Sequence, residues 1–298
     1  MNYKNTDKCM LCGDTSAGII QTEIREKSHN VLMCNSCEFI FLQNYREIDY
    51  SENYGGLTLS TEWSKEESMI KRSQSLEKFN EVVISIIKEK QCKNILEIGA
   101  GNGASIYSLK NSIDKLNIDC VEINDEDRKF IQKRLKSSVY NGITDVEKKY
   151  DLVYGHHVFE HFIDPKEMLC DIDKISNDDC KIYFSFPNFD DFYSYTLKKE
   201  QKKNYLTFNF HLAHPYYYTI DTFSRLIKQT PWKIKKISTV QDYSILNYFN
   251  WYINGTRSKD IESGTKVNDN IKWINDNFVN SIEKMQKGNN ISVILEKK

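Results

Sequence analysis

The sequence predicts an α/β protein with a doubly wound sheet, preceded by a small cysteine-rich module. Short apolar strand patterns alternate with helical patterns through most of the chain, which is typical of a parallel sheet covered by helices. The first strand of this series runs directly into a glycine-rich turn and then a helix. Two Cys-x-x-Cys pairs near the start predict the module. The 298 residues are enough for one large domain and a small one.

The composition excludes several classes of protein. With 40% hydrophobic and 28% charged residues, the chain has a globular rather than a disordered balance. A net charge of -1 disfavours a protein that binds nucleic acid through overall positive charge, and we interpret the basic stretch 198–203 as a solvated loop. No apolar run approaches the ~20 residues of a membrane span, and the polar N-terminus shows no secretory signal. We therefore expect a soluble, cytoplasmic protein without a membrane span.

The cysteine pairs predict a zinc ribbon over residues 1–45. Each pair holds two thiolates on one tight turn, and two such turns close a tetrahedron around Zn²⁺. The 21 residues between the pairs slightly exceed the usual ~15–20. Four thiolates leave no open coordination position, so the zinc should be structural and should supply folding energy; four unligated thiols are the alternative. The expected ligands are Cys9, Cys12, Cys34 and Cys37.

The rest of the N-terminal region has simpler patterns. Apolar stretches at 18–24 and 29–34 predict short ribbon strands. Residues 46–74 are interpreted as a connector, and the apolar spacing over 64–90 predicts one amphipathic helix. The four cysteines outside the ribbon lie beside or within apolar stretches and are expected in the core.

A ligand-binding turn follows the first strand of the large domain. Three alternate glycines let the backbone turn sharply and pass close to a ligand. Glu122 ends the next strand pattern, where a carboxylate can accept both ribose hydroxyls of an adenosine. Dehydrogenases share this arrangement, but Glu97 directly ahead of the turn favours S-adenosylmethionine (SAM), whose sulfonium and amino-acid groups are cationic. The turn glycines are Gly99, Gly101 and Gly103.

The resulting Glu-x-Gly-x-Gly-x-Gly sequence resembles the class I SAM-dependent methyltransferases, in particular the group with ubiquinone-pathway O-methyltransferases and sugar methyltransferases. Residues 140–165 are similar to the third and fourth motifs of this family, which places Asp145 at the adenine amino group. The resemblance implies a Rossmann-like seven-stranded sheet over residues 75–298, with an antiparallel last strand. It also implies SAM as the cofactor, and a helical insertion at about 241–289 departs from a minimal member.

Five histidines fall in two segments expected at the carboxyl edge of the sheet, where ligands bind. A histidine can remove the proton from a hydroxyl acceptor, and the residues directly after the fourth strand are the preferred candidates; merely positioning the acceptor is the alternative. The second segment would form the opposite wall, with Tyr216–Tyr218 as an aromatic rim. The preferred pair is His156 and His157, and the others are His161, His211 and His214.

Two metal-binding interpretations concern the same segment. His157-x-x-Glu160-His161 formally matches the inverted zinc-protease motif, but it lies in the fourth-motif position of a methyltransferase. Some ubiquinone-pathway relatives bind a divalent ion here with Glu-x-x-Glu-His. His157 replaces the first carboxylate, which makes a Mg²⁺ site doubtful because this ion prefers oxygen ligands.

We therefore expect a SAM-dependent methyltransferase that acts on a small molecule, by O-methylation of a sugar or nucleotide-linked sugar in bacterial surface polysaccharide biosynthesis. A ribbon ahead of this domain also resembles the sugar C-methyltransferases, which normally continue with a further C-terminal domain. An RNA or protein methyltransferase that uses the ribbon for recognition is a second alternative, disfavoured by the neutral charge and by the absence of an Asn-Pro-Pro-Tyr-like signature. The intact glycine turn disfavours a non-catalytic scaffold.

Overall fold

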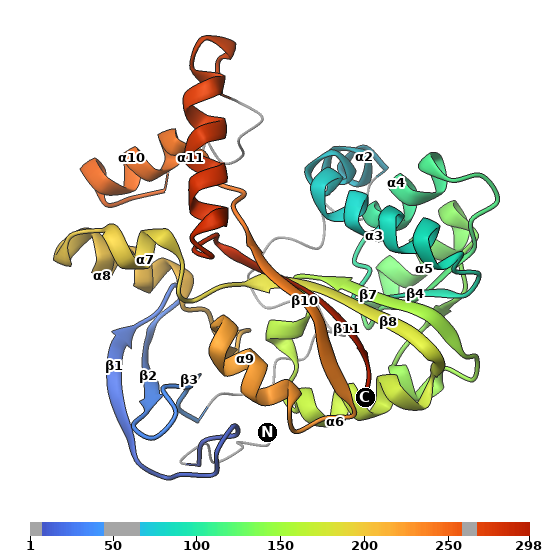
Figure 1. Cartoon of the computed structure of the whole chain (residues 1–298), viewed down its shortest axis with the longest axis horizontal. Helices are drawn as coiled ribbons and strands as arrows, with labels where there is room; N and C mark the ends of the chain where they lie inside the picture. Colours follow the sequence, from blue (N-terminus) through green and yellow to red (C-terminus); the bar gives the residue numbers. More distant parts are fainter. Residues whose placement is uncertain (1–7, 45–65, 258–266) are drawn as a thin grey trace.

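The computed structural model describes residues 8–44, 66–257 and 267–298, which form two sheets (Figure 1). The tyrosine-rich part of the expected connector, 46–65, lies outside the described residues. Within the described part of the chain, no helix is long and apolar enough to cross a membrane.

The larger sheet has seven strands in the order β10-β11-β8-β7-β4-β5-β6. Strand β11 runs antiparallel to both β8 and β10, and the other neighbours are parallel. This order confirms the predicted doubly wound α/β fold with an antiparallel last strand. The strands are β4 (Ile95–Ile98), β5 (Ile118–Val121), β6 (Val139–Tyr140), β7 (Tyr150–His156), β8 (Ser176–Pro187), β10 (Trp232–Val240) and β11 (Asn290–Lys297).

Helices cover both faces of this sheet, which explains why its strands read as continuous apolar runs. Ile95 belongs to one hydrophobic cluster with α3 (Glu77–Lys90), α4 (Ala104–Ser112) and α5 (Asp125–Leu135). Its neighbour Leu96 belongs to the cluster on the opposite face. Helices α6 (Pro165–Lys174) and α9 (Ile220–Ile227) cover that face (Figure 1).

The predicted helix over 64–90 is two helices in its described part. Helix α2 (Glu66–Ser75) ends one residue before α3, and Leu76 between them has φ −95° and ψ 7°, outside the helical range. Both halves keep the amphipathic spacing, so the pattern identified the buried face and missed the break. Met69 and Val83 are fully buried.

The smaller sheet contains the ribbon strands and one strand of the large domain. Strands β1 (Ala17–Glu23), β2 (Ser28–Cys34) and β3 (Ile40–Leu42) are antiparallel neighbours. Strand β9 (Tyr216–Tyr217) adds to the outer edge of β3, with Ile40 opposite Tyr217. The ribbon is therefore not a separate unit attached only by its linker, because β9 of the large domain completes its sheet.

The remaining helices pack beside the sheet as an aromatic bundle (Figure 1). Residues 241–289 are helical in their described part, as the sequence predicted. The basic stretch at 198–203 begins α8 and is not a loop, so that prediction was wrong. The bundle comprises α7 (Phe192–Thr196), α8 (Lys199–Asn209), α10 (Ile245–Asn254) and α11 (Lys272–Lys284).

Candidate active site

The glycine turn after β4 combines close packing with an open centre. Gly99, Gly101 and Gly103 all have positive φ, at 69°, 53° and 76°. A Cβ atom on Gly99 would lie 2.6 Å from Val158, and one on Gly103 would lie 2.6 Å from Leu135. A Cβ on Gly101 would meet nothing within 4 Å. The outer glycines thus let neighbouring elements pack, while the central one borders space that a ligand can enter.

Glu122 follows β5 and folds its carboxylate back onto this turn. Its Oε2 accepts from the Gly101 amide at 2.7 Å, and its Oε1 accepts from the Asn124 amide at 2.8 Å. Burial raises the pKa of Glu122 to about 7, because a charged carboxylate loses its hydration there. The lone pairs not used by these amides leave room for further hydrogen bonds, and the contact of Glu122 with ribose hydroxyls stays a prediction.

Glu97 lies under the turn, with a 3% exposed side chain. The Tyr154 hydroxyl donates to its Oε2 at 3.1 Å. Burial raises the pKa of Glu97 to about 8, although Tyr154 and the charge of Arg72 pull in the opposite direction. A buried carboxylate of this kind is well suited to a cationic ligand.

Two further residues complete the cofactor half. Asn102 is 1% exposed, and among the described residues neither atom of its amide has a hydrogen-bond partner. Sequence reasoning missed it, although a polar residue between two turn glycines was a usable signal. Asp145 is exposed, and its Oδ2 accepts from the Gly142 amide at 3.0 Å, which caps its own short 3₁₀ turn. Its contact with adenine stays a prediction.

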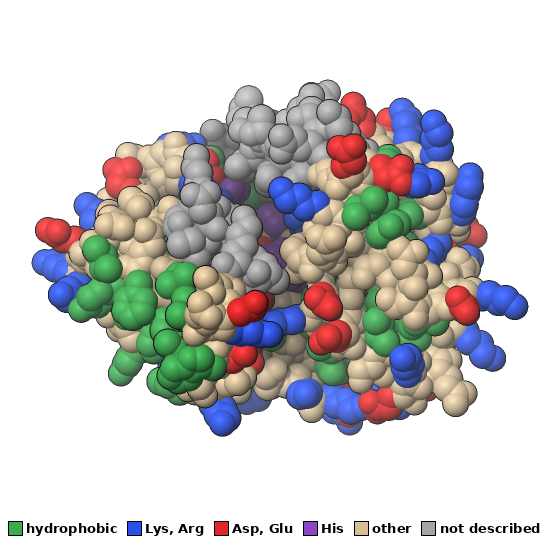
Figure 2. Space-filling view, turned by 90° about the horizontal axis from the view of Figure 1, so that it is seen from above, with side chains coloured by type: hydrophobic (Ala, Val, Ile, Leu, Met, Phe, Trp, Pro, Cys, Tyr) green, Lys and Arg blue, Asp and Glu red, His purple; other side chains and the backbone are tan. Residues whose placement is uncertain are grey.

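The structure brings the two histidine segments together. His161 and His214 have ring centroids 4.7 Å apart, and those of His214 and His211 are 5.1 Å apart. Histidine side chains lie at the floor of a depression on this face of the molecule (Figure 2). The rings of His161, His214 and His211 therefore form a row, and Glu160 lies between this row and His157. We call these four residues the histidine wall: His157, His161, His211 and His214.

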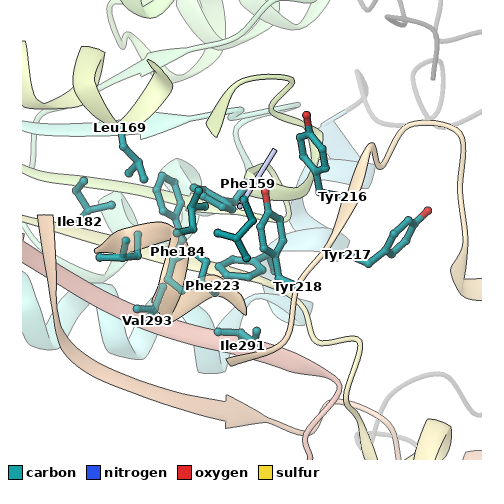
Figure 3. Packing of buried hydrophobic residues seen from close by; sticks show 14 of the residues in the cluster. Phe159, Leu169, Ile182, Phe184, Tyr216, Tyr217, Tyr218, Phe223, Ile291 and Val293 are labelled. Carbon is teal, nitrogen blue, oxygen red and sulfur yellow. The ribbon is translucent and has the colours of Figure 1, made fainter. Parts of the chain in front are cut away.

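The loop that carries the first segment is anchored by Phe159, which is fully buried. Its ring lies 5.3 Å from Phe184, 5.3 Å from Phe223 and 5.4 Å from Tyr218 (Figure 3). Burying such a side chain stabilises the fold by about 1.5–3 kcal/mol. The anchor fixes the short 3₁₀ turn Phe159–His161, so the polar side chains around it hold defined positions.

His157 and Glu160 form a histidine–carboxylate pair on this turn. His157 Nδ1 lies 3.2 Å from Glu160 Oε1, and the two side chains are 36% and 3% exposed. The two groups lie at ion-pair distance but outside hydrogen-bond geometry, and neither carboxylate oxygen of Glu160 has a hydrogen-bond partner among the described residues. His157 also has φ +51°, an uncommon value for a non-glycine residue that marks local strain. The pair places a buried carboxylate behind an accessible imidazole.

The ring of His156 lies in a different environment from the ring of His157. Its ring lies 4.6 Å from that of Phe79 on α3 and 4.3 Å from that of His157. Burial lowers the pKa of His156 well below its ordinary value. The two preferred base candidates are thus separated: His156 lies against an aromatic ring, and His157 lies against a carboxylate.

The Ala213 backbone sets the tautomers of two wall histidines. Its carbonyl is 3.0 Å from His161 Nδ1, so that nitrogen carries a proton and Nε2 carries the lone pair. Its amide donates to His211 Nδ1 at 3.0 Å, so neutral His211 carries its proton on Nε2. Burial lowers the pKa of His211 to about 4 and those of His161 and His214 in the same direction. These three imidazoles are neutral at pH 7.

The expected aromatic rim is not at the mouth of the site. Tyr216, Tyr217 and Tyr218 are 6%, 7% and 1% exposed and pack in the core between ribbon and domain. Tyr217 donates its hydroxyl to the His211 carbonyl at 3.0 Å. The prediction of a rim was wrong because two of these residues form β9, whose side chains are enclosed by β3 and the domain core.

Two residue groups have the donor atoms for a metal ion. The sulfurs of the four ribbon cysteines lie within 4.8 Å of one another; Cys9 and Cys37 are 3.6 Å apart, and Cys12 and Cys34 are 3.5 Å apart. A tetrahedral zinc with Zn–S bonds of about 2.3 Å needs sulfurs about 3.8 Å apart, so these residues fit the ion.

Of the four cysteines that were predicted to lie in the core, Cys170 is exposed, so the prediction was wrong for this residue.

The ribbon turns explain this spacing. The Gly13 amide donates to the Cys9 carbonyl at 2.8 Å, and the Glu38 amide donates to the Cys34 carbonyl at 2.9 Å. Gly13 and Glu38 have φ of 81° and 60°. Each pair therefore ends in the same left-handed turn, which directs both thiols to one side.

The second group consists of Glu160, His161 and His214, whose ligand atoms also lie within 4.8 Å of one another. Two nitrogens and one oxygen suit a transition metal better than Mg²⁺. The donor set agrees with the doubt that the sequence raised about a Mg²⁺ site.

The sheet order, the glycine turn and the acid after the second strand together define a class I methyltransferase fold. The family comparison gives the same class: a family model described as "Methyltransferase domain" matches residues 72–236. The chain belongs to this family and is a methyltransferase.

Solved structures of low sequence identity are similar to the chain. The plantazolicin methyltransferase BpumL, in complex with SAH, is 18% identical, with 79% of this chain and 87% of that chain covered and a TM-score of 0.47. A SAM-dependent methyltransferase from Archaeoglobus fulgidus is 20% identical, with coverages of 75% and 97% and a TM-score of 0.46. An O-methyltransferase from a trans-AT PKS multienzyme of Brevibacillus brevis is 14% identical, with coverages of 82% and 80% and a TM-score of 0.46. No curated protein sequence matches the chain.

Proposed function

We propose that this methyltransferase modifies a hydroxyl oxygen of a small molecule that binds against the histidine wall. The observation that carries the proposal is the His157–Glu160 pair, placed directly beside the glycine turn. Val158 connects the two, since a Cβ on Gly99 would lie 2.6 Å from its side chain. An acceptor held at His157 would thus lie next to the cofactor.

The residues can perform the proton transfer that such an acceptor needs. SAM, when bound at the glycine turn, would supply a methyl group carried on a sulfonium. The carbon–sulfur bonding electrons would stay on the sulfur when the methyl group is transferred. As the acceptor oxygen forms its new bond to that carbon, His157 Nε2 takes the hydroxyl proton. The Glu160 carboxylate beside Nδ1 stabilises the imidazolium that forms, as in other histidine–carboxylate pairs. General-base catalysis of this kind contributes about 10²–10⁴-fold, and holding the acceptor in line contributes further.

We propose a sugar, free or nucleotide-linked, as the acceptor, in bacterial surface polysaccharide biosynthesis. The histidine wall supports a polyhydroxyl compound, because the half-exposed His157 imidazole and the Glu160 carboxylate, whose oxygens have no hydrogen-bond partner among the described residues, can bond to more than one hydroxyl group. The resemblance to sugar methyltransferases supports the same class. We place the reaction in the cytoplasm, where thiols stay reduced and able to hold zinc.

We also propose that one structural zinc ion is held by the four ribbon cysteines. In this proposal the chain consists of a ribbon over 1–45, a connector over 46–74 and a methyltransferase domain over 75–298. SAM would bind in that domain against Glu97, the turn glycines, Asn102 and Glu122. The fit of the four sulfurs supports the ion.

The test is a panel of free and nucleotide-linked sugars incubated with SAM, with SAH release measured and the methylated atom located by NMR. The expected product carries an O-methyl group, and His157→Asn should slow its formation by about 10²–10⁴-fold. A product methylated on carbon would contradict the oxygen acceptor, and transfer to RNA or protein alone would contradict the small-molecule class.

A further inference from the structure

We infer that Glu26, a residue of the zinc ribbon, is a positioning residue for the acceptor side of the active site. This inference rests on the proposed function, in which the histidine wall binds the acceptor. The inference gives the ribbon a part in methyl transfer, because one of its residues would hold the acceptor side of the active site in position.

The tip of the ribbon hairpin is fastened to the segment that carries the second pair of histidines. The Arg25 amide donates to the Phe210 carbonyl at 3.0 Å, and its Nε donates to the Phe208 carbonyl at 2.8 Å. The Arg25 guanidinium also lies over the Phe208 ring, 4.3 Å from its centroid. Farther back on the hairpin, Gln21 donates to Thr207 Oγ1 at 2.8 Å. These contacts fix the hairpin tip relative to the end of α8.

Glu26 contacts His211 and Leu212, one with each of its carboxylate oxygens. Its Oε2 accepts from the Leu212 amide at 3.2 Å, and its Oε1 lies 3.0 Å from His211 Nε2. The side chain of Glu26 is only 24% exposed and that of His211 is 7% exposed. Since His211 Nδ1 already accepts from the Ala213 amide, the proton of the neutral ring is on the nitrogen that faces Glu26. The carboxylate therefore faces the protonated nitrogen of the neutral ring.

The contacts continue from His211 to the wall residue beside Glu160. The Ala213 amide donates to His211 Nδ1, and the carbonyl of the same residue accepts from His161 Nδ1 at 3.0 Å. A connected series thus runs from Glu26 through His211 and Ala213 to His161. It holds His161 in the Nδ1-protonated form, with the Nε2 lone pair directed away from Ala213.

Loss of the Glu26 carboxylate removes the charged acceptor beside His211 Nε2 and an acceptor of the Leu212 amide. The 211–214 segment then keeps its contacts with Tyr217 but loses both of its contacts with the ribbon carboxylate, so the Ala213 carbonyl that accepts from His161 Nδ1 is held less firmly. Acceptor binding and turnover should both fall, whereas the glycine turn shares no contact with Glu26 among the described residues and should bind SAH unchanged.

The experiment compares Glu26→Ala, Glu26→Gln and the control Glu23→Ala by long-range ¹H–¹⁵N NMR of histidine-labelled full-length protein loaded with SAH. Glu23 is exposed at the end of β1 and accepts only from Ser28 Oγ among the described contacts, so it controls for damage to the hairpin. SAH affinity by calorimetry and zinc content per chain show whether each variant is folded. None of these measurements needs the acceptor, so the inference can fail separately from the proposed function.

We expect His161 to show the Nδ1-protonated tautomer in the wild type and in Glu23→Ala, and a tautomer mixture in Glu26→Ala. Glu26→Gln, which keeps one oxygen, should give an intermediate spectrum. With a sugar found by the panel, kcat/KM should fall by about 10–100-fold in Glu26→Ala, partly through KM. An unchanged His161 spectrum in a Glu26→Ala protein that retains zinc and SAH affinity overturns the inference, as does an Nε2-protonated His161 in the wild type. If Glu26→Ala fails to fold, Glu26→Gln decides by the same two criteria.

Discussion

The cofactor half and the acceptor half of the site are assembled in different ways. The cofactor half lies within one continuous strand–turn–helix–strand unit, from Glu97 to Glu122, and Glu122 closes it by accepting from the Gly101 and Asn124 amides. Tyr154 on β7 adds one contact from outside this unit, to Glu97. The acceptor half joins the hairpin tip at 24–27, the loop at 156–161 and the segment at 210–214. A local unit can keep its geometry when distant parts change. A wall built from three segments depends on all of them, including the ribbon.

The most severe test of this difference removes the ribbon metal. In Cys34→Ser/Cys37→Ser the ribbon should lose its zinc, and with it a binding free energy that reaches about 10–16 kcal/mol in zinc-finger peptides. We expect methyl transfer to fall below detection while SAH affinity stays within about threefold, because the cofactor half has its own core. Elemental analysis should show the loss of one zinc per chain.

The control for this variant is Cys170→Ser, at an exposed cysteine on α6, which should keep zinc and activity. If SAH binding disappeared together with zinc, the two halves would not be separable.

A sharper comparison lies within the acceptor half. His157→Asn should lower kcat by about 10²–10⁴-fold without changing SAH affinity, since it removes the base from the pair with Glu160. His156→Asn should have the smaller effect, because that ring lies against Phe79 and not against a carboxylate. Steady-state kinetics with the identified sugar would check both. Equal effects of the two substitutions would contradict the assignment of His157 as the base.

The cofactor half should show the opposite behaviour. Glu122→Ala removes the proposed acceptor of the ribose hydroxyls and should weaken SAM binding by about 1.5–3 kcal/mol, or roughly 10- to 150-fold in Kd. Turnover at saturating SAM should change much less. Calorimetry with Glu126→Ala, an exposed acid on α5, is the control. Unchanged affinity in Glu122→Ala would remove this residue from the site.

A further expected effect is on stability as a function of pH. Burial raises the pKa of Glu97 to about 8, whereas in the unfolded chain it is close to 4.5. The folded protein therefore binds this proton more tightly. The free energy of unfolding should fall as pH rises from about 4.5 to about 8 and then level off. Thermal unfolding of the ligand-free protein at a series of pH values should show a shallower decline for Glu97→Gln. A slope identical to that of the wild type would contradict the raised pKa.

The sequence predicted the two halves unequally well, for physical reasons. Strand β4, the turn and Glu122 are close in the chain, and backbone geometry alone restricts what such a pattern can form. The row of histidines was predicted as two segments on one edge, but their contacts depend on where α8 ends and where the ribbon hairpin docks. No local pattern indicated that Glu26 would approach His211. Tyr216 and Tyr217 were misassigned for the same reason, since their partner strand β3 belongs to the ribbon.

The pairing of Ile40 with Tyr217 also imposes an order on synthesis. Ribosomes add about 5–20 residues per second, so roughly ten to forty seconds pass between the making of β3 and of β9. During that interval the outer edge of β3 has no strand to cover it, and an uncovered edge is a site where chains can pair wrongly. Contacts between residues so far apart also slow folding, because a long loop must close before they form. The ribbon strands are made before the large domain, but their sheet is completed only when β9 has been made.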